Sequence, residues 1–124
     1  IKDMANELRV HTSLQLRDGN ARTEDTGTVQ VSPSAKKAIS KTVSVTTSAA
    51  ALDFTGLTAA RYIALRNLDT TNYVDIGPDN TGTMVGLIRL LAGESCMLPL
   101  KPSTTIKAQA NTATCSVQMM ACDT

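Results

Sequence analysis

Few residues in this chain are of the types that enzymes use for acid–base or nucleophilic chemistry. His11 is the only histidine, and it falls on the polar side of the alternating stretch ELRVHTSLQLR. A catalytic triad needs a nucleophile and an orienting acid around the imidazole, and a zinc site needs several His or Cys ligands. No such partners accompany His11 at a recognisable spacing. We therefore predict neither a catalytic nor a metal-binding role for it.

The stretch VDIGPDN carries three oxygen-bearing side chains, those of Asp75, Asp79 and Asn80. A tight calcium site needs several carboxylates at regular offsets and often a bidentate Glu. Here only two acids occur, with Pro78 between them, which is the composition of an ordinary turn. We predict a turn and no metal.

The remaining acidic and glycine residues also lack a catalytic arrangement. Glu94 follows Gly93 in a predicted turn, with no apolar, aromatic-lined surrounding to raise its pKa for glycoside hydrolysis. The glycines match neither GxGxxG nor a Walker motif. The sequence therefore predicts no catalytic residue, no cofactor and no enzymatic activity.

Three cysteines, Cys96, Cys115 and Cys122, show no CxxC and no metal-ligand spacing. The simplest interpretation is three small, soft hydrophobic side chains. A disulfide between Cys96 and Cys115 stays open, because it requires that the two lie on adjacent strands with suitable geometry.

Composition excludes several classes of partner. Twelve basic and eleven acidic residues give a net charge of +1, whereas nucleic-acid-binding domains usually carry a strongly basic face. No apolar run approaches the ~20 residues that span a membrane, and the first residues lack the apolar segment of a signal peptide. With two Tyr, one Phe and no Trp, the chain is poor in the rings on which sugars and bases stack. We predict no nucleic-acid, membrane or small-molecule partner.

Apolar residues alternate with polar ones along most of the chain, which predicts β-strands. ELRVHTSLQLR (7–17) is predicted to be a half-buried strand with Leu8, Val10, Leu14 and Leu16 on one face, and residues 20–27 are predicted to be an exposed loop. TVQVS follows as a short strand. Residues 32–40 are predicted to be a connector with a helical turn.

The middle of the chain predicts a hairpin. Val43 and Val45 share one face of the strand over 40–48, and Phe54 and Leu57 indicate a turn that places an aromatic ring under the sheet. In RYIALRNLDTTNYVDIG, the inward pairs are Ile63 with Leu65 and Val74 with Ile76. The intervening LDTT is short enough for a hairpin loop.

The C-terminal third contains further short strands. MVGLIRLLAG is predicted to be a strand, or a strand broken by a bulge, because it contains Gly86 and ends at Gly93. Pro99 indicates an edge or a strand end. Met119 and Met120 are adjacent on a strand, so their side chains point to opposite faces and one of them is free for a partner. The predicted inward residues are Cys96, Leu98, Leu100, Ile106, Ala108, Ala110, Cys115, Val117 and Met119.

Short strands separated by Gly, Pro, Asn and Thr turns are typical of an all-β sandwich or barrel. We predict an all-β fold, a single small β-sandwich or jelly-roll-like barrel of about seven to nine antiparallel strands, with a more polar N-terminal arm. Residues 1–38 form the N-terminal strand or arm and connector, and residues 39–124 form the β-sandwich body.

From Arg61 to Cys122, about half the chain, the sequence resembles small β-rich structural proteins of tailed bacteriophages. The resemblance lies in RYIALRNLDTTNYVDIG, LLAGESCMLPL and TTIKAQANTATCSVQMMA. It implies no catalytic residue. It implies a protein present in many copies on a phage particle, as a capsid decoration (cement) protein or a head–tail accessory protein.

The resulting hypothesis is a structural virion protein that binds the capsid surface and stabilises the particle. Its partners would be the major capsid protein or other virion proteins, with self-association as a trimer or dimer and a location in the virion, assembled in the host cytoplasm. One alternative is a tail, collar or fibre-base protein of the virion. Another is a carbohydrate-binding β-sandwich for host attachment. The candidate partner-contact residues are Arg9, His11, Tyr62, Asp69, Tyr73 and Asp79.

Overall fold

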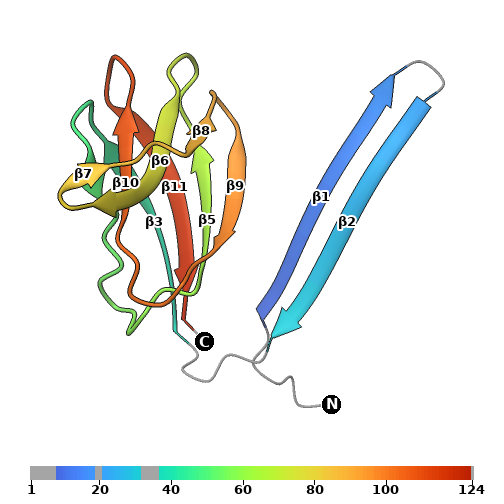
Figure 1. Ribbon diagram of the computed structural model, residues 1–124, viewed down its shortest axis with the longest axis horizontal. Coiled ribbons are helices and arrows are strands. Elements are labelled where there is room, and N and C mark those ends of the chain that lie inside the picture. Colours follow the sequence, from blue (N-terminus) through green and yellow to red (C-terminus); the bar gives the residue numbers. More distant parts are fainter. Residues whose placement is uncertain (1–7, 19–20, 32–36, 124) are drawn as a thin grey trace.

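The computed structural model describes residues 8–18, 21–31 and 37–123, and every regular element in them is a β-strand (Figure 1). Two strands form an arm: β1 (Leu8–Asp18) and β2 (Ala21–Val31) pair antiparallel with each other. Nine further strands, β3 to β11, form the body. The prediction of an all-β fold is confirmed. The division at residue 38 stays a prediction, although β3 begins at that residue.

The body is a sandwich of two antiparallel sheets. The first sheet runs, in spatial order, β3 (Ala38–Val45), β11 (Cys115–Cys122), β5 (Tyr62–Asn67) and β9 (Ser95–Pro99). The second runs β4 (Ala50–Ala51), β10 (Ile106–Ala110) and β6 (Val74–Asn80), with β7 (Thr83–Met84) and β8 (Ile88–Leu90) both paired to β6. The spatial orders β3-β11-β5-β9 and β4-β10-β6-β8 are those of the two sheets of a jelly roll.

The core lies between the two sheets, and in the part of the chain whose burial is described it consists of body residues. Alternation places every second side chain inward, and Ile63, Leu65, Val74 and Ile76 are buried as predicted. The other predicted inward residues follow the same pattern, fully buried on β10 and β11 and partly buried for Cys96 and Leu98 on β9. Phe54 and Leu57 pack against this core, and the amide of Leu57 donates to the carbonyl of Phe54 to close the predicted turn.

The predicted hairpin between β5 and β6 is wrong. β5 pairs with β11 and β9 in one sheet, whereas β6 pairs with β10, β7 and β8 in the other. The connection LDTTNY therefore crosses the sandwich as an arch. The inward pairs were still correct, because both strands face the same core from opposite sides.

Asn67 fixes the arch. Its side chain is fully buried (0% exposed) and makes three hydrogen bonds. Nδ2 donates to the carbonyls of Asn72 and Leu90, and Oδ1 accepts from the amide of Asp69. Because Leu90 belongs to β8 of the second sheet, this one amide links the end of β5 to the opposite layer.

The segment predicted as a turn around Asp79 is mostly strand. Residues 74–80 form β6, and the turn comes one step later at Thr81 and Gly82, both with positive φ (50° and 92°). Positive φ at both central residues is typical of a tight type I′ hairpin. Pro78 is tolerated within β6, where its carbonyl accepts from the amide of Val85.

The predicted break in MVGLIRLLAG is confirmed, since β7 and β8 are separate strands along one side of β6. The segment between them crosses Gly77 very closely: a Cβ at Gly77 would lie 1.7 Å from the carbonyl oxygen of Val85. Only glycine leaves room for this backbone approach.

The arm differs from the prediction in its second half. Residues 20–27 were predicted to be a loop, but Ala21 to Gly27 belong to β2 and pair with Thr12 to Asp18. The polar composition of this segment favoured the prediction of a loop. The register pairs Leu8 with Val31 and Val10 with Val29. The predicted helical turn lies largely outside the described residues, and residues 38–40 belong to β3.

A buried carboxylate holds the start of the body. Asp123 is buried, and its two oxygens accept from the amides of Lys37 and Thr58. The amide of Asp123 also donates to the carbonyl of Lys37. The residue at which the described body begins is thus attached to the C-terminal end of β11.

Candidate interaction surface

The outer surface of the first sheet is almost free of charge. Strand register arranges its solvent-side residues in three rows of four across β3, β11, β5 and β9. We call these twelve residues the outer face. They are Ala38, Cys122, Tyr62, Pro99, Ser40, Met120, Ala64, Met97, Thr42, Gln118, Arg66 and Ser95. Arg66 is the only charged residue among them.

The middle row is the most apolar part of the outer face. Met120 lies opposite Ala64, which lies opposite Met97, and Ser40 completes the row on the other side of Met120. Met120 is 51% exposed, while its neighbour Met119 is fully buried. The expectation that these two methionines point to opposite faces is confirmed. The small side chain of Ala64 leaves a shallow gap between two flexible thioethers.

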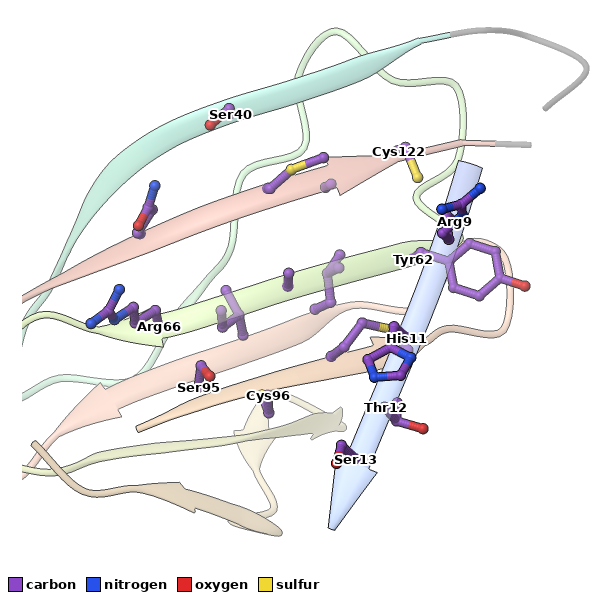
Figure 2. Close-up of a pocket in the computed structure, with 17 residues that line it drawn as sticks. Arg9, His11, Thr12, Ser13, Ser40, Tyr62, Arg66, Ser95, Cys96 and Cys122 are labelled. Carbon is purple, nitrogen blue, oxygen red and sulfur yellow. The ribbon is translucent and has the colours of Figure 1, made fainter. Parts of the chain in front are cut away.

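An open cleft of about 670 Å³ lies between this face and strand β1 of the arm (Figure 2). On the body side it is lined by the middle row and by Tyr62, Arg66 and Gln118 among others; on the arm side it is lined by residues 9 and 11–13. The arm contacts the body only sparsely. Leu14, the next residue of β1, is 74% exposed.

The structure brings three of the six candidate contact residues together. Arg9 and His11 from β1 and Tyr62 from β5 all line the cleft (Figure 2). The guanidinium carbon of Arg61 lies 4.6 Å from the centroid of the Tyr62 ring, so one face of this ring is occupied by a cation–π contact.

Asp69, Tyr73 and Asp79 lie elsewhere. The carboxylate of Asp69 accepts from the amides of Asn72 (2.6 Å) and Thr71 (3.0 Å), and these bonds lower its pKa. Oδ1 of Asp79 lies 3.0 Å from Nζ of Lys107, which lowers the pKa of Asp79. Tyr73 is stacked under Arg89, whose guanidinium carbon lies 3.9 Å from the ring centroid. Partner contact by these residues stays a prediction.

The outer surface of the second sheet is rich in charge, and its charges are paired. Arg89 on β8 lies opposite Asp75 on β6 and binds it with two nitrogens, at 2.8 and 3.1 Å. The hydrogen bond to Asp75 raises the pKa of Arg89. Lys107 on β10 binds Asp79 and the carbonyl of Gly82. This surface satisfies its own charges within the chain.

The cysteines behave as hydrophobic residues. All three are free, and burial raises the pKa of each thiol. Cys96 on β9 and Cys115 on β11 are separated by β5, so the adjacency that a disulfide between them requires is missing.

Within the described part of the chain, no group of three or more His, Cys, Asp and Glu side chains is placed to hold a metal ion. Nor does any helix there have the length and apolarity to cross a membrane.

Sequence reasoning did not identify the outer face as a unit. Alternation predicts which residues point outward on each strand, but Ala64, Met97 and Met120 come from three strands far apart in sequence. Their alignment depends on strand order and register. The only signal in the sequence was the adjacency of Met119 and Met120.

Comparisons with known proteins assign no family to this chain. No family model matches it, and no curated protein matches it. Among solved structures, it is similar to a chain described by the words "Bacillus endospore appendages form a novel family of disulfide-linked pili". That likeness covers 100% of this chain and 98% of the other, at 12% identity and a TM-score of 0.47. A likeness of this size transfers neither function nor partners.

Proposed function

We propose that this protein is a non-enzymatic structural subunit that works in many copies, with the β1–β2 arm binding a neighbouring subunit. The observation that carries the proposal is the arm itself. It is a two-stranded ribbon of eleven-residue strands that contacts its own body only sparsely. A two-stranded hairpin is marginal alone in water, so an arm of this length needs a surface to pack on.

The independence of the body supports the same role. Among the residues whose burial is described, the buried core lies between Val45 and Ala121, and the hydrophobic residues packed against it begin at Ile39. The two sheets of the body therefore enclose a core made from their own residues. We expect the arm to be available for a contact outside this core.

We further propose a virion as the setting, with the protein as a capsid decoration protein. Support for this comes from the resemblance of residues 61–122 to phage structural proteins, and the jelly-roll strand order is one that capsid proteins also use. A fold alone does not fix a function. Quantitative mass spectrometry of purified particles tests the setting: a copy number matching the capsid lattice supports decoration, whereas a small multiple of the tail symmetry indicates a tail or collar protein.

The attachment alternative is disfavoured by the tyrosines. Both lie against an arginine, Tyr62 against Arg61 and Tyr73 against Arg89. Each ring therefore has one face occupied, which leaves less aromatic surface for the stacking on which sugar binding usually depends. Binding to a glycan array at physiological salt would favour attachment instead.

Deletion of residues 1–36 tests the role of the arm. We expect the shortened chain to keep its cooperative thermal unfolding, with a midpoint within about 3 °C of the full chain, because the core is untouched. We expect its self-association, measured by sedimentation velocity, to be lost. A shortened chain that unfolds would show that the arm belongs to the core, and one that associates like the full chain would remove the arm from the assembly contact.

A further inference from the structure

The outer face and the arm each carry a large hydrophobic side chain that is at least half exposed, Met120 at 51% and Leu14 at 74%. We infer that the arm of one copy packs on the outer face of a second copy, with Leu14 of the first set against the row that contains Met120 of the second. This inference rests on the proposed function and names the partner surface for the arm. It predicts head-to-tail association.

The outer face has the chemistry of an acceptor. Eleven of its twelve residues are uncharged, and its middle row places Ala64 between Met97 and Met120. The cores of protein interfaces are depleted of charge and enriched in methionine. Methionine side chains also adapt their shape to a partner. The opposite outer surface offers ion pairs that are already satisfied, such as Arg89 with Asp75.

The arm has the chemistry of a donor. Leu14 of β1 is 74% exposed. Two β-layers can pack face to face at about 10 Å. Covering Leu14 with the sheet of a second copy would supply packing that an isolated two-stranded ribbon lacks.

The same contact is not made within the chain. The arm stands beside its own outer face, yet an open cleft of about 670 Å³ separates them and Leu14 stays exposed. Arg9, His11, Thr12 and Ser13 of β1 line this cleft. These polar residues of β1 contribute to the intrachain cleft, while the exposed Leu14 does not line it and is available to another molecule.

Packing on the face fits better than pairing along an edge. The first sheet has two edge strands, β3 with eight residues and β9 with five residues that end at Pro99. Proline has no amide hydrogen to donate, and β1 is eleven residues long. A strand added at either edge would therefore leave part of β1 unpaired.

Donor and acceptor are different surfaces of one chain, so the contact is heterologous. Such contacts generate closed rings when the rotation between subunits closes, and open filaments when it does not. Each molecule then uses its arm once and its outer face once.

Charge insertion at each surface of the full-length protein tests the inference. Leu14→Lys disables the donor and Met120→Lys the acceptor, and both positions are exposed enough to leave folding intact. Leu87→Lys is the matched control, since Leu87 is 76% exposed at the edge of the opposite sheet. We expect each of the first two variants to raise the dissociation constant of self-association at least about tenfold, and the control to leave it unchanged. Sedimentation velocity over a concentration series measures this, and circular dichroism checks the fold.

Mixing the two variants gives the decisive readout. The Met120→Lys chain keeps an unaltered arm, and the Leu14→Lys chain keeps an unaltered outer face. An equimolar mixture should therefore form a heterodimer through this one pair of surfaces and no larger assembly. If Met120→Lys disturbs the fold, Ser40→Arg places a charge in the same row at an exposed position. Absence of the heterodimer in the mixture, with both chains folded, would overturn the inference.

The outcomes separate this inference from the proposed function. If Leu14→Lys abolishes association while Met120→Lys and Ser40→Arg leave it unchanged, the outer face is not the acceptor. The arm then remains the contact, as the proposed function states. Association that survives all three substitutions and the removal of residues 1–36 overturns both. A full-length chain that stays monomeric up to about 100 μM, the range of weak interfaces, overturns head-to-tail self-association.

Discussion

The two outer surfaces of the sandwich have opposite character although they cover the same core. On the second sheet, Arg89 binds Asp75 and stacks on Tyr73, and Lys107 binds Asp79. On the first sheet, twelve aligned residues contain one charge, Arg66. A surface whose charges are all paired keeps its solubility without a partner. A surface without charges is the one that a partner can cover at little desolvation cost.

This difference separates stability from assembly within one small domain. Substitutions on or beneath the charged surface should change the free energy of unfolding and leave association per folded molecule unchanged. Substitutions on the outer face of the first sheet should do the reverse, because its exposed side chains contribute little to folding. The following predictions test this division, beginning with the largest expected effect.

Gly77→Ala should destabilise the protein most. The added Cβ would lie 1.7 Å from the carbonyl oxygen of Val85, so the segment between β7 and β8 must move off β6. We expect a loss of at least about 3 kcal/mol in the free energy of unfolding, measured by urea denaturation. Gly86→Ala, in the same segment, is the control, since a Cβ there meets nothing within 4 Å. Equal losses in both variants would contradict this account of the close approach.

Asn67→Ala should come next, at about 2–3 kcal/mol. The substitution leaves the carbonyls of Asn72 and Leu90 and the amide of Asp69 without their partner in a buried site. Chemical denaturation measures the loss, with the exposed Asn80→Ala as the matched control. A cost below about 0.5 kcal/mol would show that the arch between the sheets is held by its backbone alone.

Arg89→Met should lower the free energy of unfolding only slightly, because the ion pair with Asp75 is partly exposed and surface pairs contribute little. The cost should shrink further in about 1 M NaCl, where exposed charges are screened. Arg66→Met makes the corresponding change on the outer face of the first sheet. We expect Arg89→Met to change the salt dependence of the free energy of unfolding more than Arg66→Met does. The reverse order would contradict the difference between the two surfaces.

The inward residues of the body could be predicted from the sequence. Pairs such as Ile63 with Leu65 and Ala108 with Ala110 follow from alternation, because burial on one side of a strand imposes a period of two. Periodicity carries no information on which strand lies beside which. The connection LDTT is short enough for a hairpin or an arch, and the choice depends on the contacts of Asn67 across the sandwich.

Part of the arm and the alignment of the outer face could not be predicted from the sequence. The first part of β2 was missed because ARTEDTG has the composition of a loop, and its strand structure comes from pairing with β1, whereas the strand predicted over TVQVS is the end of β2. The row of Ser40, Met120, Ala64 and Met97 joins four strands whose register no local pattern specifies. The residues that share such a surface can be identified only when the strand order and register are known.

Acidification should produce the smallest effect, and it should arise away from the outer face. Hydrogen bonds from the amides of Asn72 and Thr71 lower the pKa of Asp69 below 3.8, and Lys107 lowers that of Asp79. A carboxyl with a lower pKa in the folded state binds fewer protons there than in the unfolded chain. Its stabilisation is therefore fully present above the unfolded pKa and is lost as the pH falls through the folded pKa.

Thermal unfolding between pH 7 and pH 2 should show a constant midpoint down to about pH 4, the ordinary range of Asp, and a decline below it. Asp69→Asn should make that decline shallower, because one of the shifted carboxyls is gone. Thr71→Val should leave it nearly unchanged, since the backbone amides bond to Asp69 more strongly than the Thr71 hydroxyl does. A decline that Thr71→Val flattens as much as Asp69→Asn would assign the shift to the hydroxyl. Because none of the twelve residues of the outer face is acidic, a substitution such as Met120→Lys should leave the acid limb in place.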